Sequence, residues 1–218
     1  MTPKLIIFDN DGVLVDSERL SNVVFAAMLT EAGLPTTFEQ SVDLYMGKRT
    51  TDCVALIESN LGSALPAAFI ADYEQRCGDV LRRELVAVEG VAELLETLQR
   101  DGTAYCIASS GTPAEIDLRL TVTGLAEHFE TDWIHSGVMV AHGKPAPDLF
   151  LYAAERHGVA PSDCVVIEDS IAGVTGAKAA GMFVVGHAAL LPPERLAEAG
   201  ADIVVGSMRE VKGLLPEL

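Results

Sequence analysis

Short apolar runs recur along the chain and predict the strands of one sheet. The first run, residues 5–8, reads Leu-Ile-Ile-Phe without interruption, which is typical of a strand buried on both faces of a parallel sheet. Similar runs predict further strands at residues 104–108, 133–136, 164–167, 183–185 and 203–205. Helical patterns separate these later runs, so strands and helices alternate. The alternation predicts an α/β fold with a Rossmann-like parallel sheet flanked by helices.

The segment between the first and second strands has a different pattern. Its apolar spacing predicts helices at residues 17–31, 38–46, 52–61 and 66–85 and no strand. Ser17 precedes the first of them and is expected to be its N-cap. We therefore predict an α/β core of residues 1–16 and 87–218, with residues 17–86 inserted as a helical cap. A cap placed at the carboxyl end of the sheet can open and close as a lid.

Two carboxylates directly follow the first strand. Asp9 and Asp11 lie at its carboxyl end, where open α/β sheets bind ligands. One carboxylate can attack a substrate while the other exchanges protons, but a pair this close repels unless a cation or hydrogen bonds offset the charge. The pair therefore implies a metal. Alone, the Asp-Asn-Asp-Gly string is also compatible with a turn, whereas the calcium loop of an EF-hand is excluded because Gly12 comes too early.

Polar residues also follow the second and fourth predicted strands. Ser109 and Ser110 come after residues 104–108, and Glu168 and Asp169 come after residues 164–167. A capping-box pattern, Thr-Pro-Ala-Glu from residue 112, predicts a helix N-terminus behind the serines, which forms an anion site. Lys144 follows in a loop that its Gly and Pro neighbours restrict. Plain structural roles remain open: a strand-end hydroxyl, a solvated lysine, and a helix cap at Glu168-Asp169.

Because parallel strands end on the same side of a sheet, these groups are expected in one cleft. Oxygen ligands from Asp9, Asp169 and the backbone at Asp11 suit Mg²⁺, whereas zinc usually recruits His or Cys. Lys144 and Ser109 are placed to hold phosphoryl oxygens. The cleft therefore favours a metal-assisted reaction at a phosphate group.

Charge and composition restrict the classes of binding partner and the cellular location that are expected. The 218 residues include 32 acidic and 15 basic side chains, a formal charge of −17, which argues against nucleic acid or an anionic membrane as a partner. No apolar run approaches the roughly 18 residues of a membrane span, and no signal peptide is recognisable, so a cytoplasmic location is expected. The four cysteines lack Cys-x-x-Cys spacing and are expected to be buried free thiols. The five histidines form no spaced ligand motif and are interpreted as structural or surface residues.

The four motifs, in this order, resemble the haloacid dehalogenase (HAD) superfamily, and the helical insertion resembles its C1-capped, β-phosphoglucomutase-like phosphatase branch. The resemblance implies that Asp9 is a nucleophile that forms an aspartyl-phosphate. It also implies that Asp11 protonates the leaving alcohol and then activates water. The implied phosphate ligands are Ser109, Ser110 and Lys144. The implied Mg²⁺ ligands are Asp9, Asp11, Asp169 and Glu168, the last bound directly or acting through a neighbouring ligand.

Departures from the family pattern narrow the chemistry further. Dehalogenases lack the second acidic residue, so the presence of Asp11 argues against carbon–halogen cleavage. Phosphonate-cleaving members use a lysine of the first cap helix, where this chain has only Arg19. Hexose-phosphate mutases carry a cap histidine near the position of Ser21 and an arginine near Thr50. This cap has no histidine, but Arg49 is one position away. Candidate substrate contacts in the cap are Ser21, Lys48, Arg49 and Arg76, although exposed charges on helices usually form solvated faces.

The expected activity is Mg²⁺-dependent hydrolysis of a small phosphorylated metabolite, such as a sugar, sugar-acid or polyol phosphate. A hexose-phosphate mutase is the alternative within the family, and a catalytically silent phospholigand-binding protein is an alternative of another class. A phospho-receiver module is disfavoured, because such a module would be about half this length and would carry its acceptor aspartate on a later strand. The pattern carries no information on oligomeric state or on the natural substrate.

Overall fold

The computed structural model describes residues 3–215. A central sheet forms the middle layer of this structure. The six strands are parallel in the order β3-β2-β1-β4-β5-β6. Their bounds are β1 (Leu5–Phe8), β2 (Tyr105–Ser109), β3 (Ile134–Ser136), β4 (Cys164–Glu168), β5 (Phe183–His187) and β6 (Ile203–Val205). Strand β1 lies between β2 and β4, and all four of its side chains are buried. The α/β parallel sheet predicted from the apolar runs is confirmed.

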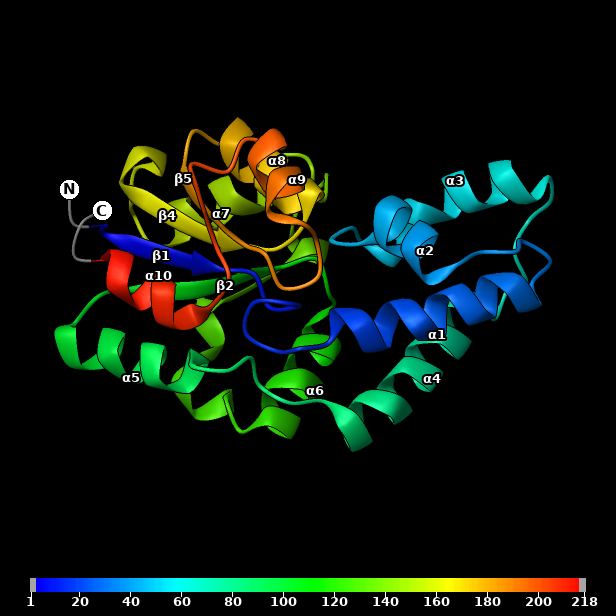
Figure 1. Cartoon of the computed structure of the whole chain (residues 1–218), viewed down its shortest axis with the longest axis horizontal. Coiled ribbons are helices and arrows are strands. Elements are labelled where there is room, and N and C mark those ends of the chain that lie inside the picture. The colour runs from blue at the N-terminus through cyan, green and yellow to red at the C-terminus, as the bar shows by residue number, and fades with distance from the viewer. Residues whose placement is uncertain (1–2, 216–218) are drawn as a thin grey trace.

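Helices cover both faces of this sheet (Figure 1). Alternate β1 residues point to opposite faces, so Ile6 and Phe8 belong to one apolar cluster while Leu5 and Ile7 belong to the other. The first cluster is covered by α5 (Val91–Asp101), α6 (Pro113–Thr123) and α10 (Met208–Leu214). The second is covered by α7 (Asp148–Arg156), α8 (Ile171–Ala179) and α9 (Pro193–Glu198).

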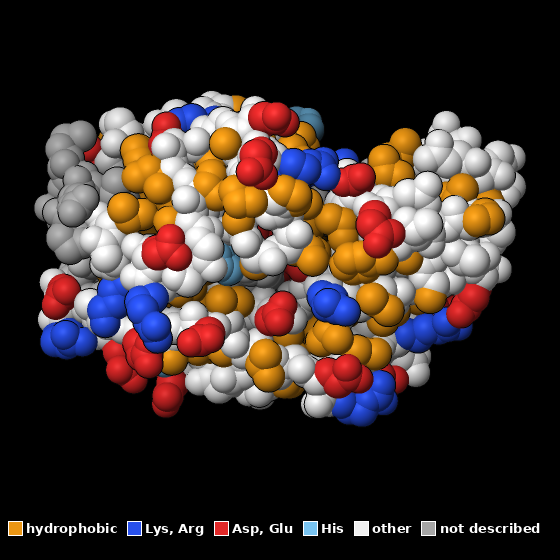
Figure 2. Space-filling view, in the orientation of Figure 1, with side chains coloured by type: hydrophobic (Ala, Val, Ile, Leu, Met, Phe, Trp, Pro, Cys, Tyr) orange, Lys and Arg blue, Asp and Glu red, His pale blue; other side chains and the backbone are white. Residues whose placement is uncertain are grey.

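Four helices between β1 and α5 project from one end of the sheet (Figure 1). They are α1 (Glu18–Glu31), α2 (Phe38–Tyr45), α3 (Thr50–Leu61) and α4 (Phe69–Glu84). The Phe25 ring of α1 makes edge-on contacts with Tyr45, Phe69 and Tyr73. Figure 2 shows a hollow at the edge of the molecule where this helical segment meets the α/β layers. The helices lie in the predicted insertion, and the division into core and cap stays a prediction.

The two connections to the helical segment are paired with each other. Val15 and Ala87 form an antiparallel bridge. The Asp16 amide donates to the Val86 carbonyl at 3.0 Å, and the Val88 amide donates to the Leu14 carbonyl, also at 3.0 Å. The chain therefore leaves and rejoins the α/β layers at one place.

The predicted elements differ from the observed ones mainly where elements are short. Every predicted strand is present, with ends displaced by no more than two residues. Helices α9 and α10 and four short 3₁₀ turns were not predicted, because six or seven residues are too few for a repeated helical pattern. The 3₁₀ turns are Ala126–His128, Thr131–Trp133, Gly137–Met139 and Pro161–Asp163. All four cysteines are buried and free, as predicted. Among the described residues, no helix is long and apolar enough to cross a membrane.

Candidate active site

Lys144 is buried between two carboxylates at the carboxyl end of the sheet. Its Nζ donates to Asp9 Oδ1 at 2.6 Å and to Glu168 Oε1 at 2.6 Å. Burial opposes the charge on the lysine, but the Asp9 and Glu168 carboxylates raise the pKa of Lys144. Burial raises the pKa of Asp9 to about 7, against the lowering effect of Lys144. One ammonium thus stabilises a carboxylate that follows β1 and another that ends β4.

Both carboxylate oxygens of Glu168 already have protein donors. Oε1 accepts from Lys144, and Oε2 accepts from the Ser170 amide at 3.0 Å and the Ser170 hydroxyl at 2.9 Å. Gly173 leaves room for this carboxylate, because a Cβ atom there would lie 1.7 Å from Oε1. This bonding favours Glu168 as the residue that holds Lys144 beside Asp9.

Asp169 is different, because its carboxylate is buried without a partner. Neither Oδ1 nor Oδ2 accepts a hydrogen bond, and the residue is 1% exposed. Burial, together with the Glu18 and Glu168 carboxylates, raises the pKa of Asp169 well above its ordinary value. Oxygens of Asp9, Glu168 and Asp169 lie within 4.8 Å of one another. An unpaired buried carboxylate is costly, so this cluster of hard oxygen donors fits a divalent cation such as Mg²⁺.

The close approach of Asp169 depends on glycine. Gly12 has a φ of +75°, a left-handed conformation that side chains disfavour. A Cβ atom at Gly12 would lie 1.7 Å from Asp169 Oδ2. The turn after β1 therefore has to be glycine for Asp169 to reach the cluster.

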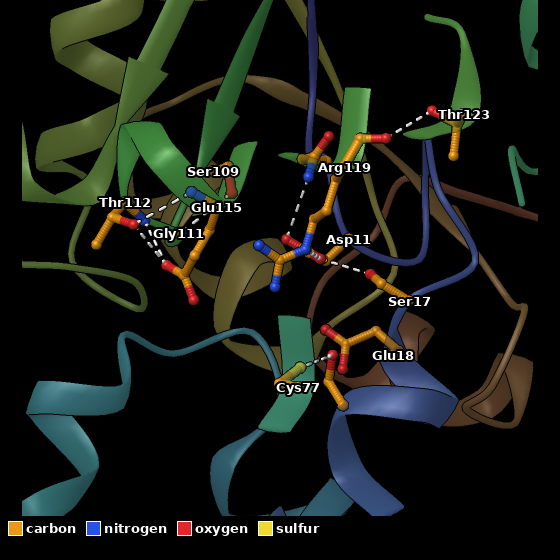
Figure 3. A network of polar contacts seen from close by, with 12 residues as sticks. Asp11, Ser17, Glu18, Cys77, Ser109, Gly111, Thr112, Glu115, Arg119 and Thr123 are labelled. Atoms are coloured by element: carbon orange, nitrogen blue, oxygen red, sulfur yellow. Dashed lines mark hydrogen bonds and ion pairs between the residues drawn. The ribbon is translucent and has the colours of Figure 1, made fainter. Parts of the chain in front are cut away.

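Asp11 belongs to a second polar network, on the side of α1 and α6 (Figure 3). Its Oδ1 accepts from the Ser17 hydroxyl and forms an ion pair with Arg119, whose Nε lies 2.6 Å away. Ser17 occupies the predicted N-cap position of α1, but its side chain makes no cap hydrogen bond. Its hydroxyl orients Asp11 instead.

Two charged residues of this network were not predicted from the sequence. Arg119 is buried on α6, with its Nη1 lacking a hydrogen-bond partner. Glu18 is buried at the start of α1, where its Oε2 accepts from Asn22 Nδ2 at 2.8 Å. Burial, then the neighbouring Asp11 and Asp9 carboxylates, raise the pKa of Glu18 to about 8. Glu18 has the pattern of an ordinary acidic first turn, and no local signal distinguishes Arg119 from other basic helix residues.

The two serines at the carboxyl end of β2 lie where the sheet meets the helical segment. Ser109 Oγ accepts from the Gly111 amide at 3.1 Å, and Ser110 Oγ donates to the Gly47 carbonyl at 2.9 Å. The predicted capping box at the start of α6 is present, with reciprocal bonds between Thr112 and Glu115. The amino end of α6 thus lies directly behind the two serines.

A cavity of about 130 Å³ lies between this end of the sheet and the helical segment. Asp9, Asp11 and Ser110 line it, whereas Ser109, Lys144 and Asp169 are not among its lining residues. The walls also include three of the four candidate substrate residues, Ser21, Lys48 and Arg49, together with Glu18, Asn22, Tyr45 and Arg119.

The candidate substrate residues Ser21 and Arg49 have protein partners in this structure. Ser21 Oγ lies 3.4 Å from Cys77 Sγ. The Arg49 guanidinium pairs with Asp52 at 2.6 Å and donates to the Gly137 carbonyl at 3.0 Å. Arg49 therefore connects the helical segment to the loop that follows β3.

Sheet order and site chemistry together define an α/β enzyme that carries an aspartate nucleophile candidate at the end of its central strand. The chain belongs to the haloacid dehalogenase-like hydrolase family, whose model matches residues 6–187. It is 32% identical to a probable pseudouridine-5'-phosphatase of Drosophila melanogaster, over 94% of this chain and 90% of the relative. It is 34% identical to the protein CbbY of Rhodobacter capsulatus, over 85% of each.

A solved structure extends the comparison to the fold. The HAD family hydrolase from Deinococcus radiodurans, determined with bound phosphate and sodium, has a TM-score of 0.77 and 32% sequence identity. The match covers 99% of this chain and 96% of that one. The predicted superfamily and its phosphatase branch are therefore confirmed.

Proposed function

We propose that this protein is a Mg²⁺-dependent phosphomonoester hydrolase that acts on a small phosphorylated metabolite through an aspartyl-phosphate on Asp9. The observation that carries the proposal is the arrangement of Asp9, which is paired with buried Lys144 and lies beside the unpartnered Asp169 carboxylate. Such a site joins a nucleophile to a cation and to free oxygen ligands. These are the parts that transfer of a phosphoryl group requires.

The reaction has two steps. In the first, a carboxylate oxygen of Asp9 attacks phosphorus, the bond to the ester oxygen breaks, and Asp11 gives its proton to the departing alcohol. In the second, Asp11 takes a proton from water, whose oxygen attacks the phosphorus of the acylphosphate, releasing phosphate and regenerating Asp9. Acid and base assistance of this kind contributes roughly 100- to 10,000-fold in rate. Lys144, Ser109 and Ser110 hold the phosphoryl oxygens.

The carboxylates of Asp9 and Asp169, with the backbone carbonyl at Asp11, would hold Mg²⁺. When bound, the cation supplies positive charge to the phosphoryl oxygens and to the crowded carboxylates. Glu168 contributes by fixing Lys144, since both of its oxygens already accept hydrogen bonds. The related hydrolase from Deinococcus radiodurans was determined with bound phosphate and sodium, which supports binding of an anion and a cation.

The cavity favours a hydroxyl-rich substrate of modest size. Its volume is about 130 Å³, and the polar residues Glu18, Ser21 and Asn22 of the helical segment are among those that line it. Sugar, sugar-acid and polyol phosphates match this surface, and one relative is named a probable pseudouridine-5'-phosphatase. Several polar wall groups can each bond a substrate hydroxyl, and leaving one of them unpaired disfavours a wrong substrate.

The test is phosphate release from a panel of sugar, sugar-acid and polyol phosphates with Mg²⁺. Asp9→Asn and chelation are each expected to lower release by at least about 1,000-fold, because removing a nucleophile costs that much or more in hydrolases. Asp16→Asn is the matched control, because Asp16 is an exposed acid in the same loop, and it should retain full activity. Unchanged release in Asp9→Asn would contradict the mechanism.

Two other outcomes identify the alternatives. An isomerised sugar phosphate, without release of phosphate, would identify a mutase in place of the hydrolase. Binding of a phosphorylated compound without turnover would identify a catalytically silent binding protein. Either result would overturn the proposed hydrolysis.

A further inference from the structure

Three soft metal ligands converge on the sheet face that α7 covers, away from the catalytic carboxylates. Cys106 lies in β2, His135 lies in the neighbouring strand β3, and His157 directly follows α7. The Cys106 Sγ and one ring nitrogen of each histidine lie within 4.8 Å of one another. These residues are far apart in sequence, which is why the sequence shows no spaced ligand motif.

The two imidazoles lack the partners that buried rings ordinarily have. His135 is 2% exposed, yet its Nε2 has no hydrogen-bond partner, and the Nε2 of His157 is buried and unpartnered as well. The rings meet nearly at right angles, with their centroids 5.4 Å apart. An unsatisfied buried polar atom destabilises the folded state. Two such nitrogens beside a thiol therefore point to a bound cation that both nitrogens can coordinate.

We propose that Cys106, His135 and His157 form a binding site for Zn²⁺ or a cation of similar softness. Thiolate sulfur and imidazole nitrogen are the ligands that zinc prefers, whereas Mg²⁺ prefers oxygen. Three protein ligands leave one of the four tetrahedral positions for water. On binding, the Cys106 S–H bond is replaced by a sulfur–metal bond, and the proton leaves to solvent.

The position of the cluster lets a cation enter from solvent and lets a bound cation link separate elements of the fold. His157 is only half-buried, so a cation can arrive from solvent at the end of α7. Bonds of about 2.0–2.3 Å to the metal would draw the three side chains closer together. The bound cation would then cross-link β2, the edge strand β3 and the end of α7, which no disulfide does because all four cysteines are free.

The test uses Co²⁺ as a spectroscopic substitute for zinc, added to the protein with excess Mg²⁺ to occupy the carboxylates. A thiolate bound to Co²⁺ absorbs in the near ultraviolet, and carboxylate ligands give no such band. We expect a band that saturates at one equivalent, disappears on adding Zn²⁺, and is absent in Cys106→Ala. His157→Gln should weaken Co²⁺ binding at least about tenfold, since loss of even an outer partner of a metal ligand costs that much.

His128→Gln is the matched control, because the His128 ring also has a buried, unpartnered nitrogen but lies outside the cluster. It should leave the band unchanged. Absence of the band in the native protein, or its persistence in Cys106→Ala, would overturn the proposal. So would cobalt binding that is lost in Asp169→Asn and kept in His157→Gln. Circular dichroism of each variant reports folding, and the half-buried His157 provides a second variant if Cys106→Ala does not fold.

Discussion

At the scale of single residues, the site separates two neighbouring aspartates by giving each its own buried cation. Asp9 is paired with Lys144, and Asp11 is paired with Arg119. Two carboxylates this close in sequence would otherwise repel and favour protonation of one of them. Because the two cations come from different elements, the aspartates are oriented independently. This independence suits residues that are proposed to have different chemical roles.

The substitution Arg119→Met tests the ion pair between Asp11 and Arg119. We expect the free energy of unfolding to fall by about 3 kcal/mol, because removing one partner leaves a largely buried carboxylate uncompensated. The proposed phosphatase activity should fall about 10- to 100-fold as Asp11 loses its orientation. Urea denaturation and phosphate release measure the two effects.

Arg119→Lys and Arg100→Met are the controls for this prediction. The lysine retains the charge and should recover part of both losses. Arg100 is exposed on α5, so its replacement should change stability by less than about 0.5 kcal/mol. Equal effects of Arg100→Met and Arg119→Met would show that the Asp11 pair has no special role.

The local sequence predicted the carboxylates of these ion pairs but not the arginine that pairs with Asp11. The residues Asp9, Asp11, Glu168 and Asp169 follow the predicted strands, so their position at the sheet edge could be predicted from chain direction alone. Arg119 lies 108 positions beyond Asp11 on a helix, and its pairing depends on how α6 is placed against β1. Only tertiary packing determines such a contact.

At the scale of elements, the turn after β1 controls how closely Asp169 approaches Asp9. Strand β1 was predictable because four consecutive apolar residues fill a buried strand. The turn was predicted only as a site of carboxylates, and its contact with β4 depends on the pairing of β1 with β4. The glycine requirement at position 12 is therefore a property of two elements together.

Gly12→Ala and Gly102→Ala form a matched pair that isolates this contact. Both glycines have positive φ, +75° and +68°, so alanine costs each about 1 kcal/mol of conformational strain. A Cβ at Gly102 meets nothing within 4 Å, whereas a Cβ at Gly12 would overlap Asp169. We expect Gly102→Ala to keep full activity and Gly12→Ala to lose at least about tenfold, with a higher Mg²⁺ requirement.

The dependence of phosphate release on Mg²⁺ concentration measures this difference. Urea denaturation of both variants separates strain from the displacement of Asp169. The same Mg²⁺ dependence in both variants would show that Asp169 tolerates the added methyl group. That outcome would remove Asp169 from the proposed cation site.

At the scale of the whole molecule, burial of acidic groups couples stability to pH. The pKa of Asp9 is raised to about 7 and that of Glu18 to about 8, compared with about 4 in an unfolded chain. The folded state therefore holds protons that the unfolded state releases between about pH 4 and pH 8. Their stabilising contribution is complete below about pH 4 and is lost as pH rises through the folded pKa values.

We therefore expect the free energy of unfolding, without divalent cations, to fall from pH 5 to pH 8 by up to roughly 6 kcal/mol, because each of the two groups contributes about 3 kcal/mol. Glu18→Gln should make this decrease shallower, because glutamine has no proton to lose. Glu39→Gln, at an exposed position on α2, should leave it unchanged. Urea denaturation across this pH range, with chelator present, provides the measurement, and equal slopes for all three proteins would contradict the linkage.

Mg²⁺ should act most strongly where these carboxylates are ionised. A cation held by Asp9 and Asp169 competes with their protons, so it stabilises the fold more at pH 8 than at pH 5. Repeating the denaturation with Mg²⁺ should flatten the pH dependence of the native protein.

The paired connections of the helical segment have a consequence for how this architecture can vary. Because Val15 and Ala87 already lie side by side, the distance between the ends of the inserted segment does not depend on its length. Loop-closure entropy also grows only slowly with the number of inserted residues. The junction is therefore a place at which one inserted helical segment can be exchanged during evolution for another of different length. The strands that carry the phosphoryl chemistry would keep their register through such an exchange.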